Sequence, residues 1–289
     1  VDKDLGIDIV WHSDVDDATQ TIVDNLKDAK KIGVDKHWSA NFLLDLMEKL
    51  PDVKFVNGSK CVDYKRMVKD DHEQQLMIEA SRINDQAIHE VIHQVSLGLS
   101  ELEVAAKLGD IYSKFGGEGN SFDAIIAYGA NGANPHHEND ASCLKPGDSI
   151  IIDMGCKYQG YCSDMTRTVF YKEVSQEAKE VYELVKAANE AAEAMIKPGV
   201  RLCDIDKTAR DLITKAGYGK EFNHRLGHFI GKDVHEYGDV SVNFDLEVQE
   251  GMIFSIEPGV YLPGKFGVRI EDLVLVTKDG CKVLNSYTK

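Results

Sequence analysis

The stretch Ser149-Ile-Ile-Ile-Asp153-Met-Gly-Cys-Lys-Tyr-Gln-Gly-Tyr-Cys-Ser-Asp164-Met-Thr-Arg-Thr168 has the pattern of a β-hairpin. An apolar run enters, Tyr158-Gln-Gly160 turns, and an alternating run returns. Counting outward from the turn places Asp153 and Asp164 roughly opposite each other, and opposed residues of an antiparallel pair share a face. Two inward-facing carboxylates repel each other. The pair therefore requires a proton, a cationic side chain or a metal ion.

The hairpin has a counterpart later in the chain. Gly147-Asp-Ser-Ile-Ile-Ile-Asp153-Met-Gly155 and Gly251-Met-Ile-Phe-Ser-Ile-Glu257-Pro-Gly259 carry glycine, acid and glycine at identical offsets. A returning strand with another acid follows each copy, Asp164 in the first and Glu271 in the second. The repeat predicts two similar α+β halves related by an approximate twofold axis, with four carboxylates converging on one site.

The alternative for these acids is that they face solvent, as most Asp and Glu side chains do. Against it, all four recur at matched positions among apolar neighbours. His228, in the glycine-rich segment Gly227-His-Phe-Ile-Gly231, offers a nitrogen donor nearby. Four carboxylates and one imidazole are too rich in oxygen for structural zinc. They suit two divalent ions, and we expect Mn²⁺, with Co²⁺, Zn²⁺ or Fe²⁺ as substitutes.

The order Asp153, Asp164, His228, Glu257, Glu271 and the motifs around these residues resemble the metallopeptidases of the pita-bread fold. The motifs are Gly-His-Phe-Ile-Gly, Val-His-Glu, Glu-Pro-Gly-Val-Tyr and Val-Arg-Ile-Glu-Asp. Within that group the chain most resembles Xaa-Pro dipeptidases (prolidases) and Xaa-Pro aminopeptidases. The resemblance covers about residues 70 to 289, and five ordered ligands in matching contexts make it specific.

The resemblance implies a role for each matching residue. Asp153 would hold one metal ion, His228 and Glu257 the other, and Asp164 and Glu271 would bridge both. The other implied residues are His136 and His235 beside the substrate, Glu257 as a proton shuttle, Arg269 supporting the ligands, and Tyr261 near the pocket. Alternation along the strand independently puts Arg269 on the face of Glu271.

One residue departs from the family pattern. Phe229 directly follows the ligand His228, where these families usually have a small residue. We expect Phe229 to alter the pocket wall or the ligand loop and to favour short substrates.

Residues 1–67 alternate predicted strands and helices, with an apolar start at 7–11, helices near 18–30 and 38–50, and strands at 31–34 and 53–56. This is too short for a complete α/β domain, so we expect an incomplete amino-terminal domain at 1–67 before a catalytic domain at 68–289. Within the latter we expect helices at 72–95, from the capping box Ser100–Glu103 to Gly116-Gly117, at 175–196 and at 204–216, with a strand at 121–127.

Several residues keep two interpretations. Either His136 or His137 could face the substrate, although the family match favours His136. His89 and His93 lie one helical turn apart and could bind metal, but no repeated acid points to them. Cys156 and Cys162 flank the hairpin turn and could bind metal or form a disulfide. We favour the alternative, that they are small packing residues. The six cysteines contain no C-x-x-C pair, as is typical of reduced thiols.

A net charge of -16 and a pI near 5.0 argue against nucleic acid and anionic membranes as partners. There is no apolar run of membrane-spanning length and no leader-like start, so we expect a soluble cytoplasmic protein and, as its assembly, a homodimer.

The ligand set predicts hydrolysis by a metal-activated water, and the resemblance implies that the bond cleaved is the Xaa-Pro bond of short peptides. Methionine-type aminopeptidase, two-metal phosphoesterase and non-catalytic peptide-binding module are the alternatives. The phosphoesterase lacks phosphate-binding cations besides Arg269. A binding module has no need of all five ligands.

Overall fold

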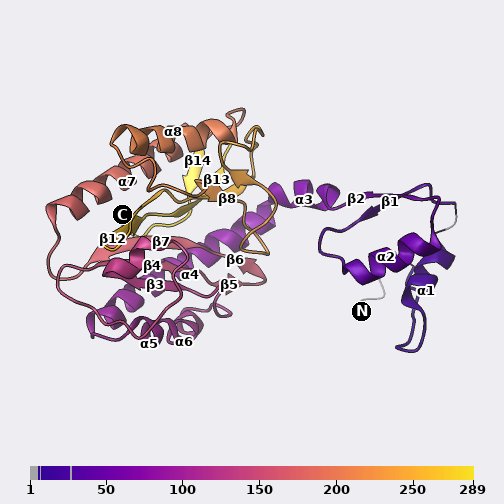
Figure 1. Cartoon of the computed structure of the whole chain (residues 1–289), viewed down its shortest axis with the longest axis horizontal. Helices are drawn as coiled ribbons and strands as arrows, with labels where there is room; N and C mark the ends of the chain where they lie inside the picture. The colour runs from indigo at the N-terminus through magenta and orange to yellow at the C-terminus, as the bar shows by residue number, and fades with distance from the viewer. Residues whose placement is uncertain (1–5, 7, 27) are drawn as a thin grey trace. The chain divides into compact units, whose positions relative to one another are not determined.

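The computed structural model describes residue 6, residues 8–26 and residues 28–289. The chain forms two compact units that divide between Lys65 and Arg66. Figure 1 follows the chain from one end to the other. No helix in the described part is long and apolar enough to cross a membrane.

The first unit alternates helix and strand, as the sequence predicts. Its elements are α1 (Ala18–Asn25), β1 (Lys31–Val34), α2 (Ala40–Lys49), β2 (Lys54–Asn57) and the beginning of α3 (Lys60–Met67). The two strands are parallel, with Lys31 opposite Lys54. Residues 8–11 form no strand, and residue 7 lies outside the described residues. Helix α1 ends earlier than predicted because Leu26, with φ of -98° and ψ of 44°, already lies outside the helical region.

The first half of the second unit packs helices against an antiparallel sheet. Its elements are α4 (Asp71–Ser96), α5 (Glu101–Ala105), α6 (Leu108–Lys114), β3 (Ile125–Tyr128), the 3₁₀-helix η1 (Gly129–Ala133), β4 (Ser149–Met154), β5 (Lys157–Tyr158), β6 (Tyr161–Cys162) and β7 (Met165–Phe170). The predicted capping box between Ser100 and Glu103 is confirmed. The helix that it opens is divided into α5 and α6, and β3 begins later than predicted.

The hairpin differs from the prediction in its register. Gln159 and Gly160 form a two-residue turn in which both have positive φ, 48° and 77°. In this register Asp153 lies opposite Thr166, not Asp164. Asp164 is two residues away from that pair on the same strand, so it keeps the face of Asp153. The prediction of the shared face holds, whereas direct opposition is wrong.

The second half repeats the order of helices followed by a hairpin. Its elements are α7 (Gln176–Met195), α8 (Leu202–Lys215), β8 (Gly227–His228), β9 (Asp239–Val240), β10 (Ile253–Ile256), β11 (Gly259–Leu262), β12 (Phe266–Arg269), β13 (Asp272–Val276) and β14 (Cys281–Val283). Ile256 lies opposite Asp272, and Gly259 lies opposite Arg269. The same register sets Glu257 opposite Glu271.

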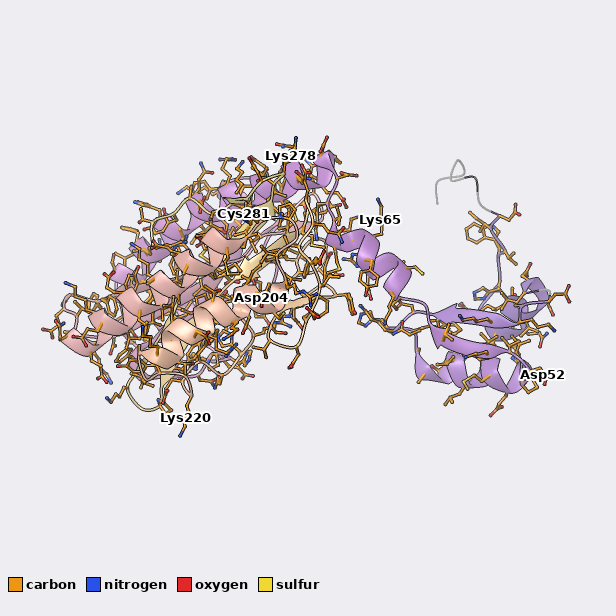
Figure 2. All side chains as sticks on the ribbon, turned by 90° about the horizontal axis from the view of Figure 1, so that it is seen from above. Asp52, Lys65, Asp204, Lys220, Lys278 and Cys281 are labelled. Atoms are coloured by element: carbon orange, nitrogen blue, oxygen red, sulfur yellow. The ribbon has the colours of Figure 1, made fainter. Side chains whose placement is uncertain are left out.

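Helices cover the strands of the second unit on two sides. Figure 1 shows α7 and α8 along one side and α4, α5 and α6 along the other. In Figure 2, α7 and α8 lie side by side, with Asp204 near the amino-terminal end of α8. One apolar core lies between α7, α8 and the strands of the second half, and another between α4, α6 and those of the first. The strand ends that carry the acids are thus held between two rigid layers.

Candidate active site

A cavity of about 650 Å³ lies in the second unit and is lined by both halves. The predicted residues that line it are Asp153, Asp164, His228, Glu257, Glu271, His136, His235, Tyr261 and Arg269. A volume of this size suits a small substrate such as a short peptide.

The five predicted ligands converge around the His228 ring. Its Nε2 atom lies 3.6 Å from Asp164 Oδ2, 3.6 Å from Glu257 Oε1 and 3.9 Å from Glu271 Oε1. Donor atoms of Asp164, His228 and Glu271 all lie within 4.8 Å of one another. The approach of His228 depends on its neighbour Gly227, where a Cβ atom would lie 1.8 Å from the carbonyl oxygen of Ser255.

Burial shifts the pKa values of this cluster toward the neutral forms. Desolvation, followed by the neighbouring Asp153, raises the pKa of Asp164 well above its usual range. Desolvation and then Asp164 do the same to the pKa of Glu271, and desolvation raises the pKa of Glu257 to about 7. The pKa of His228 is lowered, chiefly by burial. The ring is therefore neutral at pH 7, as a metal ligand must be.

The donor set fits divalent metal ions. Asp153 Oδ1 and Asp164 Oδ1 are buried and have no hydrogen-bond partner among the described residues. Buried carboxylate oxygens normally have partners, because leaving one without a partner is costly. Oxygen-rich ligands with one imidazole are those that Mn²⁺ and similar ions accept.

Arg269 connects the acids of the two halves. Its guanidinium donates to Asp153 Oδ2 at 2.5 Å, to Thr166 Oγ1 at 3.1 Å and to the Tyr261 hydroxyl at 2.9 Å. Thr166 in turn donates to Glu271 Oε2 at 2.7 Å. The cation therefore offsets the charge of Asp153 and orients a hydroxyl that holds Glu271.

His224 extends this chain of hydrogen bonds. Its Nε2 atom lies 3.0 Å from the Tyr261 hydroxyl, and its Nδ1 atom lies 2.7 Å from the carbonyl oxygen of Arg225. Because the carbonyl oxygen of Arg225 can only accept, Nδ1 carries the ring proton, and Nε2 of the neutral ring accepts from the Tyr261 hydroxyl. The pKa of His224 is lowered to about 3, mainly by burial and then by Arg269, which keeps the ring neutral.

The two adjacent histidines separate in the structure. His136 lines the cavity, whereas His137 points to α5, where its Nε2 atom lies 2.6 Å from Glu101 Oε2. His235 also lines the cavity and packs edge to face on His228, with ring centroids 4.3 Å apart. Burial, followed by His228, lowers the pKa of His235 to about 4. Both substrate-side candidates of the sequence thus face the ligand cluster.

Phe229 does not narrow the cavity, contrary to the expectation. Its ring is fully buried in the core of the second half, where it contacts Phe254 at a centroid distance of 5.4 Å. The reason is strand alternation, since consecutive residues of an extended segment point to opposite faces and His228 takes the cavity face. Phe229 contributes through its backbone instead: its carbonyl oxygen lies 3.2 Å from His228 Nδ1.

The other histidine and cysteine candidates lie away from the site. His89 and His93 are exposed on α4. All six cysteines are free thiols. Cys156 and Cys162 are buried and donate to the carbonyl oxygens of Ala80 and Lys232, and burial raises their pKa to about 11 and 12. Both behave as packing residues.

Sequence reasoning missed His224 and Thr166. Thr166 carries a signal, because it lies two residues after Asp164 on a strand and therefore shares its face. His224 carries none, because its position depends on contact with Tyr261, which is remote in sequence.

Comparison with known proteins agrees with this geometry. Residues 75–278 match metallopeptidase family M24, and residues 3–68 match the Creatinase/Prolidase N-terminal domain. The putative dipeptidase YkvY of Bacillus subtilis is 43% identical over 236 residues, which is 82% of this chain and 65% of YkvY. The Xaa-Pro dipeptidase of Pyrococcus horikoshii is 37% identical over 90% of this chain and 74% of its own.

A solved structure agrees as well. The Xaa-Pro dipeptidase from Bacillus anthracis superposes with a TM-score of 0.91 at 34% identity, covering 99% of this chain and 80% of that one. The chain thus spans somewhat less than two thirds of YkvY and more of the other two proteins. The family model alone covers well over half of the chain. The chain belongs to metallopeptidase family M24, with the α+β pita-bread fold and a Creatinase/Prolidase N-terminal domain in front.

Proposed function

We propose that this chain hydrolyses the Xaa-Pro bond of short peptides that have a free amino terminus and proline at the second position. The observation that carries the proposal is the convergence of Asp153, Asp164, His228, Glu257 and Glu271 in one cavity, with carboxylate oxygens left without partners. These five residues would hold two divalent ions, Mn²⁺ by preference, with Co²⁺, Zn²⁺ or Fe²⁺ as substitutes. When bound, the ions supply Lewis-acid chemistry: activation of water and polarisation of the scissile carbonyl.

The protein's own groups would do the rest. His136 and His235 both line the cavity, where they could stabilise the negative charge that develops on the substrate carbonyl. Glu257 lines the cavity beside His228, where its carboxylate is placed to accept and return a proton. Arg269 would orient Asp153 and offset its negative charge through their hydrogen bond at 2.5 Å.

The proposed chemistry can accept proline because of what it requires of its substrate. A prolyl amide has no N–H group, so a peptidase that must hydrogen-bond that group cannot use it. The proposed chemistry needs only the carbonyl oxygen and space for the ring. The acidic cluster attracts the positively charged amino terminus, and the similarity to two Xaa-Pro dipeptidases supports this choice.

The test is a substrate panel on the metal-loaded protein. We expect kcat/KM to be highest for an Xaa-Pro dipeptide, lower for Xaa-Pro-Yaa, and lowest for Met-Ala and for a phosphate ester. Faster cleavage of Xaa-Pro-Yaa would assign an aminopeptidase, and faster cleavage of Met-Ala would assign a methionine-type enzyme. Tight peptide binding with no cleavage would assign a binding module. The homodimer and the cytoplasmic location stay predictions.

A further inference from the structure

Glu101, the first residue of α5, is a fully buried carboxylate that does not line the cavity. Its Oε1 atom accepts from the backbone N–H of Tyr128 at 2.8 Å and from Asn131 Nδ2 at 2.9 Å. Its Oε2 atom accepts from the backbone N–H of Asp140 at 3.0 Å and contacts His137 Nε2 at 2.6 Å. Because a carboxylate that already accepts three N–H bonds has only acceptor capacity left, His137 Nε2 carries a proton and donates.

The four partners of Glu101 belong to one segment of the chain. Tyr128 is its first residue and Asp140 its last, with Asn131 and His137 between them. Backbone hydrogen bonds add to the attachment, since Glu101 N donates to Ser142 O at 3.2 Å and Leu102 N donates to Asp140 O at 3.1 Å. A single side chain thus holds both ends and the middle of residues 128–140, which we call the His136 loop.

The His136 loop needs such an attachment for chemistry as well as for folding. His136 is solvent-exposed and lines the cavity, so the position of its backbone determines where its ring lies. A donor that stabilises developing charge must be held within a fraction of an ångström, and a displacement of about 1 Å costs about a hundredfold in rate. The neighbouring His137, fixed on Glu101, limits the freedom of the His136 backbone.

We propose that Glu101 is a positioning residue, which acts through His137 and the two ends of the His136 loop to hold His136 against the substrate. The proposal rests on the function proposed above. The simpler alternative is that Glu101 only stabilises the packing of α5 on β3, in which case its loss would lower stability without a specific effect on His136.

Glu101→Gln tests the proposal with little change of shape. One oxygen becomes an amide group that faces two N–H donors, so half of the attachment is lost. We expect kcat on an Xaa-Pro dipeptide to fall between about 10- and 100-fold, with KM and metal content little changed. Glu103→Gln is the matched control, because Glu103 lies on the same helix, is exposed and, within the described part of the chain, forms its hydrogen bonds with Ser100. The control should keep wild-type kcat.

A double-mutant cycle separates positioning from general packing. In the His136→Ala background, Glu101→Gln should cause no further loss of kcat, because the group that it positions is gone. Equal fold-losses in both backgrounds would overturn the proposal. If Glu101→Gln does not fold, His137→Ala replaces it in the cycle, since Glu101 then keeps three of its donors. A wild-type kcat for His137→Ala would also overturn the proposal.

Amide hydrogen exchange gives a readout that does not depend on activity. The N–H groups of Tyr128 and Asp140 donate to different oxygens of Glu101, so in Glu101→Gln the one that faces the new amide group should exchange faster. In Glu103→Gln the exchange of both should be unchanged. Unchanged exchange in both variants would refute the anchoring. If the wild type cleaves no Xaa-Pro peptide, the proposed function fails by itself, while the exchange result still decides whether Glu101 anchors the loop.

Discussion

The two halves of the second unit bring their acids to the site by hairpins of different length. In the first half a two-residue turn sets Asp153 opposite Thr166, with the returning acid, Asp164, offset by two residues. In the second half a longer hairpin sets Glu257 opposite Glu271. The two entering strands carry their acids at equivalent positions, whereas the acids of the two returning strands differ in register by two residues.

Because the two hairpins are not equivalent, each half completes the site with contacts that it makes to the other. The second half supplies Arg269 to Asp153, and the first half supplies Thr166 to Glu271. The ligand histidine, His228, comes from the second half alone. The convergence of ligands therefore depends on contacts across the two halves, and an internal repeat of the strands is not sufficient.

Removing one returning acid from either half should have the largest effect. We expect Asp164→Asn and Glu271→Gln each to lower kcat at least about a thousandfold, because a metal ion contributes several kcal/mol to the transition state. Metal content should fall while the circular dichroism spectrum is unchanged, since an amide relieves the repulsion between buried carboxylates. Near-wild-type turnover in either variant would show that the halves do not share one metal centre.

The next largest effect should come from the two histidines of the His136 loop. His136→Ala should lower kcat about a hundredfold with metal content retained, because a single donor to developing charge has that weight. His137→Ala should cost clearly less, about tenfold, because His137 acts only through Glu101 and the loop. Steady-state kinetics of the two purified variants measure the difference. Equal, mild losses of kcat would indicate that both histidines are ordinary surface residues of the loop without a role in catalysis.

The cross-half cation gives a smaller expected effect. Arg269→Lys keeps the charge but loses the planar fork that contacts Asp153, Thr166 and Tyr261, so metal affinity should fall about 10- to 100-fold. Isothermal titration with Mn²⁺ measures the change. Arg82→Lys is the matched control, because Arg82 is exposed on α4 and pairs with Glu79. An unaltered affinity of Arg269→Lys for Mn²⁺ would contradict the proposal that Arg269 links the ligands of the two halves.

The last of these predictions concerns the pH dependence of stability in the metal-free protein. Desolvation raises the pKa of Glu257 to about 7, so the folded state binds its proton more tightly than the unfolded state. The free energy of unfolding should therefore fall as pH rises from about 4.5 to about 7, by at most about 3 kcal/mol from this group. Urea unfolding of the wild type and of Glu257→Gln measures this contribution, which the Gln variant should lack. Identical pH profiles would contradict the assignment.

The sequence predicts the acids of the site better than their surroundings. Asp153 and Glu257 are marked by glycines at matched offsets in strands that are buried on both sides, a pattern set by local chemistry. The register error arose because turn length cannot be read from Tyr158-Gln-Gly160, and a change of one residue in the turn shifts every pair. His224 depends on contact with Tyr261, which no local pattern encodes. Phe229 was predictable, since alternation with His228 already directs it to the core.

The most direct test of the central claim is a titration of the metal-stripped protein with Mn²⁺ while hydrolysis of an Xaa-Pro dipeptide is followed. We predict no turnover without metal and a rise that ends at two ions per chain, with the same stoichiometry by elemental analysis. Turnover in the metal-free protein, a plateau at one ion, or two bound ions without cleavage would contradict the claim.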